Sequence, residues 1–256
     1  MSVRRIANVL HKEWLLMSRS PSNLLFVVVI PLVLVGQAVF LAWVLPRFLA
    51  VGVPTSGLAE GLSDVERFRA LILDQFRLFV LIIPAMVANV FATLSIVEEK
   101  ITRTLEPLLA TPVRTWELLV GKILSGAVPA MAVTWASTGL FVLVAAGLGW
   151  GSLLGRVIGP AWYLAVFLLT PAISLLSFAV GVIGSSRARD AKEAQNLAVL
   201  VVLPLFVLIG VQVTGWVRFT AVWTLVLSGG LVVLDGLMIR LAVRVFARES
   251  ILIGWR

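Results

Sequence analysis

The chain has no cysteine and only one histidine, His11, among its 256 residues. These absences exclude a disulfide framework, a thiolate metal site and a metal centre built from clustered histidines. Charged residues are also scarce, at 13% of the chain, and they gather between long uncharged runs. A soluble domain of this length needs a charged exterior, so the composition is typical of a membrane protein.

Apolar residues make up 60% of the chain and are concentrated in long runs. Several runs reach the roughly 20 residues that a helix needs to cross about 30 Å of hydrocarbon. We therefore expect an all-α polytopic membrane protein, with about six transmembrane helices in a single domain over residues 1–256. The predicted spans are residues 24–45, 78–97, 123–148, 160–183, 197–215 and 219–239.

Two segments flank the first predicted span. In residues 1–23, apolar side chains recur at helical spacing with charges on the remaining surface, which predicts an interfacial helix in the headgroup region. The alternative is a cytosolic extension of the first span. No small-residue cleavage site follows a short apolar core, so we expect no removable signal peptide. Residues 46–77 hold Gly, Pro, Ser and several charges, which predicts an external loop with one short helix near residues 65–73.

The distribution of positive charge predicts how the chain is oriented. With 21 Lys and Arg against 13 Asp and Glu the chain is basic, but the basic residues flank apolar runs and form no stripe with aromatics. Nucleic acid is therefore not an expected partner. If the amino terminus is cytosolic, the inside segments hold 15 of the 21 positive residues. The positive-inside rule then predicts a multi-pass protein of the inner (plasma) membrane with both termini in the cytosol.

The most informative segment is the predicted inside loop, residues 98–122. Acidic and basic residues alternate there with leucines, and Thr111-Pro112 is a strong start signal for the next helix. The pattern predicts a short helix that points into the cytosol. Its apolar side chains either receive a docking partner or pack back against the ends of the bundle, and periodicity alone favours neither.

The run SIVEEKITRTLEPLLATPVRTWELLVGK, residues 95–122, resembles the first cytosolic loop of the type 2 (ABC-2) permeases of ATP-binding-cassette transporters. The matching residues are Glu98, Glu99, Lys100, Thr104, Leu105, Glu106, Leu108, Leu109, Thr111, Pro112, Leu118, Gly121 and Lys122. Many members have Gly-Thr where this chain has Arg103-Thr104, a departure that bears on the subgroup. The predicted topology is also similar to that of the family over the whole chain.

The resemblance implies a permease that supplies a translocation path and is driven by a separate ABC-type ATPase subunit, which binds ATP and Mg²⁺. The chain itself is expected to be no enzyme and to bind no cofactor or metal. In agreement, it has no GxxxxGK[ST] phosphate loop, because Gly121-Lys122 is followed by Ile123. A second permease copy, identical or related, and membrane lipid are the other expected partners. The residues expected to couple to the ATPase are Glu98, Glu99, Arg103, Thr104, Leu105, Glu106, Leu108 and Leu109.

Strong polar groups are rare inside the predicted spans. Gln37, Asn89 and Gln212 are candidates for the translocation path, although each is also a plausible interhelical hydrogen-bonding group. For Asp235 we expect an ion pair with Arg240 or a snorkelling arrangement at the inner boundary, in preference to a proton-coupling carboxylate. A mostly aliphatic and aromatic path favours a hydrophobic or amphiphilic cargo such as a drug, lipid or glycan, and the resemblance favours export.

Three other functions compete with this interpretation. A secondary transporter or channel needs intramembrane ionisable groups or a selective filter, and one aspartate near a boundary is weak support. A membrane enzyme needs a nucleophile with its base, metal ligands or paired carboxylates, and no histidine lies near any serine in the sequence. A non-transporting assembly factor for the cell envelope is not excluded by the residues.

Overall fold

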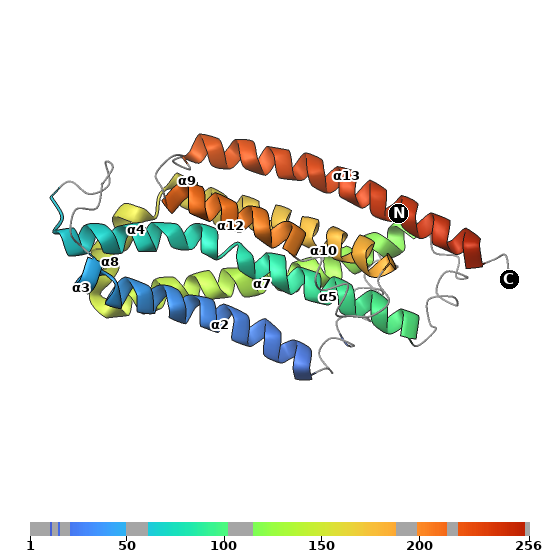
Figure 1. Cartoon of the computed structure of the whole chain (residues 1–256), viewed down its shortest axis with the longest axis horizontal. Helices are drawn as coiled ribbons and strands as arrows, with labels where there is room; N and C mark the ends of the chain where they lie inside the picture. Colours follow the sequence, from blue (N-terminus) through green and yellow to red (C-terminus); the bar gives the residue numbers. More distant parts are fainter. Residues whose placement is uncertain are drawn as a thin grey trace.

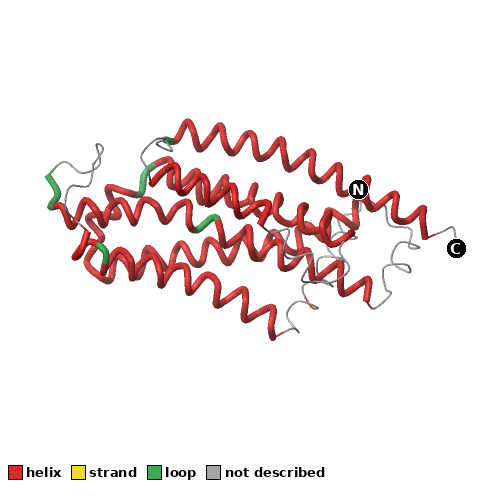
Figure 2. The backbone as a smooth tube through the Cα atoms, viewed as in Figure 1, coloured by secondary structure: helices red, strands yellow, loops and turns green. Residues whose placement is uncertain are grey.

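The computed structural model describes His11, Leu15 and residues 21–49, 61–101, 115–187, 199–213 and 220–253. Within these residues every regular element is a helix, which confirms the all-α fold. The long helices run side by side along the length of the molecule (Figure 1), and the described loops between helices are short (Figure 2). They are α2 (Pro21–Val44), α4 (Asp64–Phe79), α5 (Ile82–Ile101), α7 (Thr115–Ala145), α10 (Thr170–Arg187), α12 (Val199–Val213) and α13 (Ala221–Ile253).

Five helical stretches in the described chain are long and apolar enough to cross a membrane. They are Val27–Phe48, Asp64–Thr93, Leu118–Val157, Pro160–Ser185 and Ala221–Arg244. The predicted span at residues 197–215 corresponds to a shorter apolar helix, Leu200–Gln212. At 1.5 Å per residue the described part of that helix is about 20 Å long. The chain is a polytopic membrane protein, as its composition indicates.

The second membrane stretch differs from its prediction. Residues 64–77, expected to belong to an external loop, form most of α4, and the short helix expected at residues 65–73 extends to Phe79. A tight turn joins α4 to α5 and keeps its backbone groups bonded, with Val80 N donating to Phe76 O at 2.8 Å and Ile83 N to Val80 O at 3.1 Å. The two helices therefore continue one another along the bundle, and the buried side chains of α4 belong to the core.

A helical hairpin closes one end of the bundle after α7. The π-helical segment η1 (Ala146–Trp150) contains Gly149, whose φ of +83° lies in the left-handed region that favours glycine. The chain reverses there into α8 (Gly151–Val157) and then enters α9 (Pro160–Leu164), with proline in its first turn. A second π-helical segment, η2 (Ala165–Leu169), leads into α10. The short helix α3 (Pro46–Leu49) lies at the same end as α8 (Figure 1).

The core is centred on α5 and α10, which form the most extensive helix pair of the described chain. Their backbones approach closely at Gly181, where an added Cβ would lie 2.7 Å from Cβ of Ala92. At Gly126 of α7 an added Cβ would collide with the ring of Phe178. Small residues at helix contacts allow this close packing, which is the main source of helix association within a bilayer.

Candidate functional site

The loop expected to contact an ATPase is positioned by α5 and α7. α5 extends to Ile101, past the predicted span that ends at residue 97, and α7 begins at Thr115, before the predicted span that begins at residue 123. Both helix ends lie at the right-hand end of the bundle in Figure 1. The loop residues 102–114 lie outside the described residues. The two helices therefore bring the ends of the loop to one pole of the molecule.

The predicted coupling residues fall in two groups. Glu98 and Glu99 belong to the last two turns of α5, although their side chains lie outside the described part of the structure. The remaining six lie outside the described residues altogether: Arg103, Thr104, Leu105, Glu106, Leu108 and Leu109. Their role in coupling stays a prediction.

A buried lysine ties the two helices together below this loop. Lys122 of α7 is only 1% exposed, and its Nζ donates a hydrogen bond to Ser95 Oγ of α5 at 2.8 Å. The backbone carbonyl of Lys122 also accepts from Ser125 Oγ at 2.7 Å. The sequence analysis counted Lys122 as a cytosolic charge. In the sequence, the only signal for a structural role of Lys122 was its position in the Gly121-Lys122 pair that ends the loop motif.

The three candidates for the translocation path lie in different environments. Asn89 is 1% exposed in α5, accepts from Thr93 Oγ1 at 3.4 Å and lies against Gly181 of α10. Gln212 of α12 donates to Asp74 Oδ2 at 3.1 Å, whereas Gln37 is exposed on α2. Within the described residues no hydrogen bond joins these three side chains to one another, so each is better described by its own surroundings.

Gln212 belongs to a polar cluster that links α4 to α12, made of Asp74, Gln75, Arg77 and Gln212. Arg77 Nη2 lies 3.3 Å from Asp74 Oδ2, and the two side chains are only 10% and 16% exposed. Gln75 Nε2 donates to the carbonyl of Ile209 at 3.1 Å. Opposite charges three residues apart on one helix face each other, and α12 supplies a further donor to the carboxylate. We call these four residues the α4–α12 polar cluster.

The sequence analysis missed this cluster because it assigned residues 46–77 to a loop. The charges of α4 lower its apolar content, and the partners of Asp74 and Gln75 lie more than 130 residues away in α12. One local signal was present, namely the spacing of Asp74 and Arg77. Next to them, the stacked rings of Phe76 and Phe141, with centroids 3.6 Å apart, bind α4 to α7.

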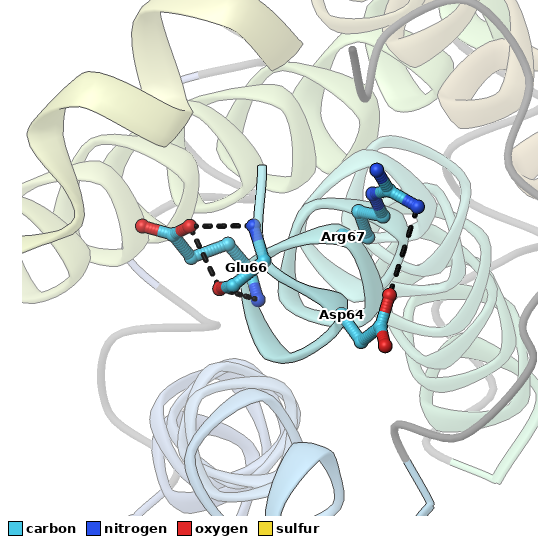
Figure 3. Close-up of polar contacts among 4 residues, drawn as sticks. Asp64, Glu66 and Arg67 are labelled. Atoms are coloured by element: carbon cyan, nitrogen blue, oxygen red, sulfur yellow. Dashed lines mark hydrogen bonds and ion pairs between the residues drawn. The ribbon is translucent and has the colours of Figure 1, made fainter. Parts of the chain in front are cut away.

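The start of α4 is fixed by polar contacts (Figure 3). Ser63 and Glu66 form a capping box, in which Glu66 Oε2 accepts from Ser63 N at 3.0 Å and Ser63 Oγ accepts from Glu66 N at 3.4 Å. Arg67 pairs with Asp64 at 3.6 Å on the same turn. Arg69 Nε donates to the carbonyl of Ala42 at 3.1 Å. These contacts define where α4 begins and join it to α2.

Arginine and tryptophan side chains meet at this same end of the bundle. The guanidinium carbon of Arg69 lies 4.7 Å from the centre of the Trp150 ring, and that of Arg47 lies 4.1 Å from the centre of the Trp43 ring. Such cation–π contacts and tryptophans with mixed apolar and polar character are common where a membrane protein meets the headgroup region.

The expected ion pair between Asp235 and Arg240 is wrong. Asp235 is 4% exposed, and neither of its carboxylate oxygens has a hydrogen-bond partner in the described structure. Arg240 is exposed. Five residues rotate an α-helix by about 140°, so the two side chains leave α13 in different directions.

The family of the chain follows from a comparison over nearly its whole length. The family model for ABC-2 family transporter proteins matches residues 7–248. The chain belongs to the ABC-2 transporter family. A search of curated proteins finds no match to this ABC-2 protein.

Membership in the ABC-2 family indicates the general function of this helical bundle. An ABC-2 protein is the membrane-embedded transport subunit of an ATP-binding-cassette transporter, and an ATPase is its implied partner. The loop motif of residues 95–122 lies inside the matched region, as do all described spans. Among the described residues of this ABC-2 permease, no three His, Asp or Glu side chains are grouped so that they could hold a metal ion.

Proposed function

We propose that this permease exports a hydrophobic or amphiphilic substrate, such as a drug, a lipid or a glycan attached to a lipid, and is driven by a separate ABC-type ATPase. The family match over residues 7–248 carries the proposal. The ATPase subunit supplies ATP and Mg²⁺ chemistry, while this chain supplies the path. Two permease copies, identical or related, lie in the inner membrane and contact two ATPase subunits on its cytosolic side. Both termini of the chain are in the cytosol.

The arrangement of α5 and α7 supports docking of the ATPase on the loop that joins them. Both helices extend beyond the predicted spans at one pole, and Lys122 and Ser95 bond them to each other just below it. A displacement of the loop therefore moves α5 and α7 together. The acidic residues Glu98 and Glu99 would fix the docking register, and the leucines of the loop would contribute buried area.

The interior of the described bundle supports an apolar or amphiphilic cargo over a small ion. Seven of its buried hydroxyl side chains donate to carbonyls of their own helix, as Thr134 does to Ala130 at 2.7 Å and Ser174 to Thr170 at 2.7 Å. Such hydroxyls are already satisfied and provide no ring of ligands for an ion. Export is the direction that the loop resemblance favours.

The experiment that tests the proposal is co-purification of the full-length permease from its own membranes, followed by an ATPase assay. The wild-type chain should bring down an ATPase subunit. Leu105→Asp places a charge on the apolar docking face and should reduce the bound ATPase activity by about tenfold or more. Glu99→Lys should have a similar effect by reversing a docking charge.

Two controls separate coupling from folding. Leu105→Met preserves apolar volume and should leave the bound ATPase unchanged. Val65→Asp places the same charge on an exposed position at the far end of the bundle and should also leave the bound ATPase activity unchanged. If Leu105→Asp prevents membrane insertion, or if wild-type preparations contain no ATPase, the proposed division of labour is contradicted.

A further inference from the structure

The buried face of α13 contains one carboxyl group without a counter-charge. Asp235 lies 14 residues after Ala221, where this membrane stretch begins, and 4 before residue 239, where the predicted span ends. At 1.5 Å per residue it is about 21 Å from one limit and about 6 Å from the other. Its side chain is 4% exposed, and both oxygens lack a hydrogen-bond donor in the described structure. The group is thus buried among the helices and isolated within the described structure.

The hydroxyl side chains on the same face of α13 as Asp235 make their hydrogen bonds to backbone carbonyls and not to the carboxyl group. Thr224 Oγ1 donates to the carbonyl of Thr220 at 3.0 Å, and Ser228 Oγ donates to the carbonyl of Thr224 at 2.7 Å. Both hydroxyl protons are therefore used within the helix. The two arginines that follow Asp235 on α13 with described side chains, Arg240 and Arg244, are exposed. They are rotated from it by about 140° and 180° around the helix axis.

The helices packed against α13 provide no described counter-charge either. These are α7, α9, η2 and α10. In α7, Lys122 donates to Ser95, and in α9, Tyr163 is exposed. Glu117 of α7 and Arg187 of α10 are the other ionisable residues of these elements, and their side chains lie outside the described part of the structure. Asp235 makes no ion pair with any described side chain, and η2 has no ionisable residue.

An isolated carboxylate in an apolar interior is very unfavourable, and a carboxyl group in such a place becomes neutral by binding a proton. We propose that Asp235 is a proton-binding site on the buried face of α13. The folded permease keeps this proton at pH values at which an ordinary aspartate is ionised. Water must reach the buried face of α13 before the site can ionise, so protonation and the packing of α13 are linked.

Infrared difference spectroscopy of the full-length permease in lipid nanodiscs tests the protonation state directly. A protonated carboxyl group gives a C=O stretch that an ionised carboxylate lacks. The wild-type minus Asp235→Asn spectrum should show that stretch at about pH 7, where an ordinary aspartate is ionised. Asp74 is the matched control, because it is also buried but has Arg77 and Gln212 as partners. The wild-type minus Asp74→Asn spectrum should show carboxylate bands instead.

Stability against pH gives a second, independent measurement. The folded chain keeps a proton that the unfolded chain releases near about pH 4. Above that pH the unfolding equilibrium constant should therefore rise by about tenfold per pH unit until the site ionises. Asp235→Asn should remove this slope, and Asp235→Glu should retain it. Should the asparagine variant fail to fold, the glutamate variant replaces it in the infrared measurement, because its C=O band is displaced from that of the wild type.

Three outcomes would overturn the proposal. The first is carboxylate bands from Asp235 at about pH 7. The second is a stability profile that is the same in the wild type and in Asp235→Asn. The third is stabilisation of the wild type, but not of Asp235→Asn, by Na⁺ at constant pH, which would make the site a metal-cation site. A C=O stretch that is lost with rising pH, together with the stability slope, establishes the proton site.

Discussion

Asp74 and Asp235 are both buried carboxyl groups in membrane stretches, and their surroundings are opposite. Asp74 lies 3.3 Å from Arg77 and accepts a hydrogen bond from Gln212, whereas Asp235 has no partner in the described residues. A buried ion pair fixes the geometry of the elements that contribute to it, here α4 and α12. An isolated group fixes no geometry and is free to change its charge. The comparison indicates which acid is structural and which can respond to its environment.

The largest expected effect comes from removing the partner of Asp74. Arg77→Met keeps the apolar stem but leaves the carboxylate buried without its counter-charge. We expect a loss of about 3–5 kcal/mol in the free energy of unfolding. Thermal unfolding of the purified permease in lipid nanodiscs measures it. In Arg77→Met/Asp74→Leu both charges are absent, and most of the stability should return. If it does not, Arg77 acts through contacts other than the ion pair.

A smaller effect is expected from Gln212. Replacing it by leucine removes the 3.1 Å hydrogen bond to Asp74 Oδ2 while retaining the ion pair with Arg77. We expect a loss of about 1–3 kcal/mol by the same unfolding measurement. In the Asp74→Leu background the cost of Gln212→Leu should largely disappear. An equal cost in both backgrounds would mean that Gln212 does not act through Asp74.

Asp235 should tolerate substitution far better than Asp74. Asp235→Asn replaces a neutral acid by a neutral amide of similar shape, so at about pH 4, where the unfolded wild type still binds its proton about half of the time, we expect a change below about 1 kcal/mol. Asp74→Asn weakens the ion pair and should cost several times more under the same conditions. Equal costs at the two positions would remove the distinction between them.

The smallest effect is expected at the exposed ion pair of α4. Arg67 and Asp64 are 3.6 Å apart, and the aspartate is largely exposed. Arg67→Gln should therefore change the free energy of unfolding by less than about 0.5 kcal/mol. The measurement shows how much of the Arg77 effect is due to burial. A loss as large as that of Arg77→Met would contradict the importance of burial.

Hydropathy predicted most of the spans because the lipid interior requires long apolar helices. It failed for α4, whose charges suggest a loop when the sequence is considered alone. Those charges are accommodated by groups distant in sequence, such as the carbonyl of Ala42 for Arg69 and Gln212 for Asp74. A local pattern does not contain such partners. The α4–α12 polar cluster could therefore not have been identified before the fold was known.

Asp235 shows a different limit of sequence reasoning. Proximity along the chain suggested a pair with Arg240, but helical rotation separates the two side chains. For the path candidates, polarity identified Asn89 and Gln212 as interior groups, while Gln37 is exposed. The coupling residues of the loop remain predictions based on the resemblance, since Arg103 to Leu109 lie outside the described residues.

The near contact of backbones at Gly181 and Ala92 restricts how the permease can move. An added methyl group at Gly181 would meet Cβ of Ala92 at 2.7 Å, so the two helices have almost no clearance there. Sliding one helix along the other would force larger side chains into this narrow point. Tilting about it keeps the contact intact. We therefore expect rearrangements of the transporter to keep this contact, with α5 and α10 tilting about it instead of sliding past each other.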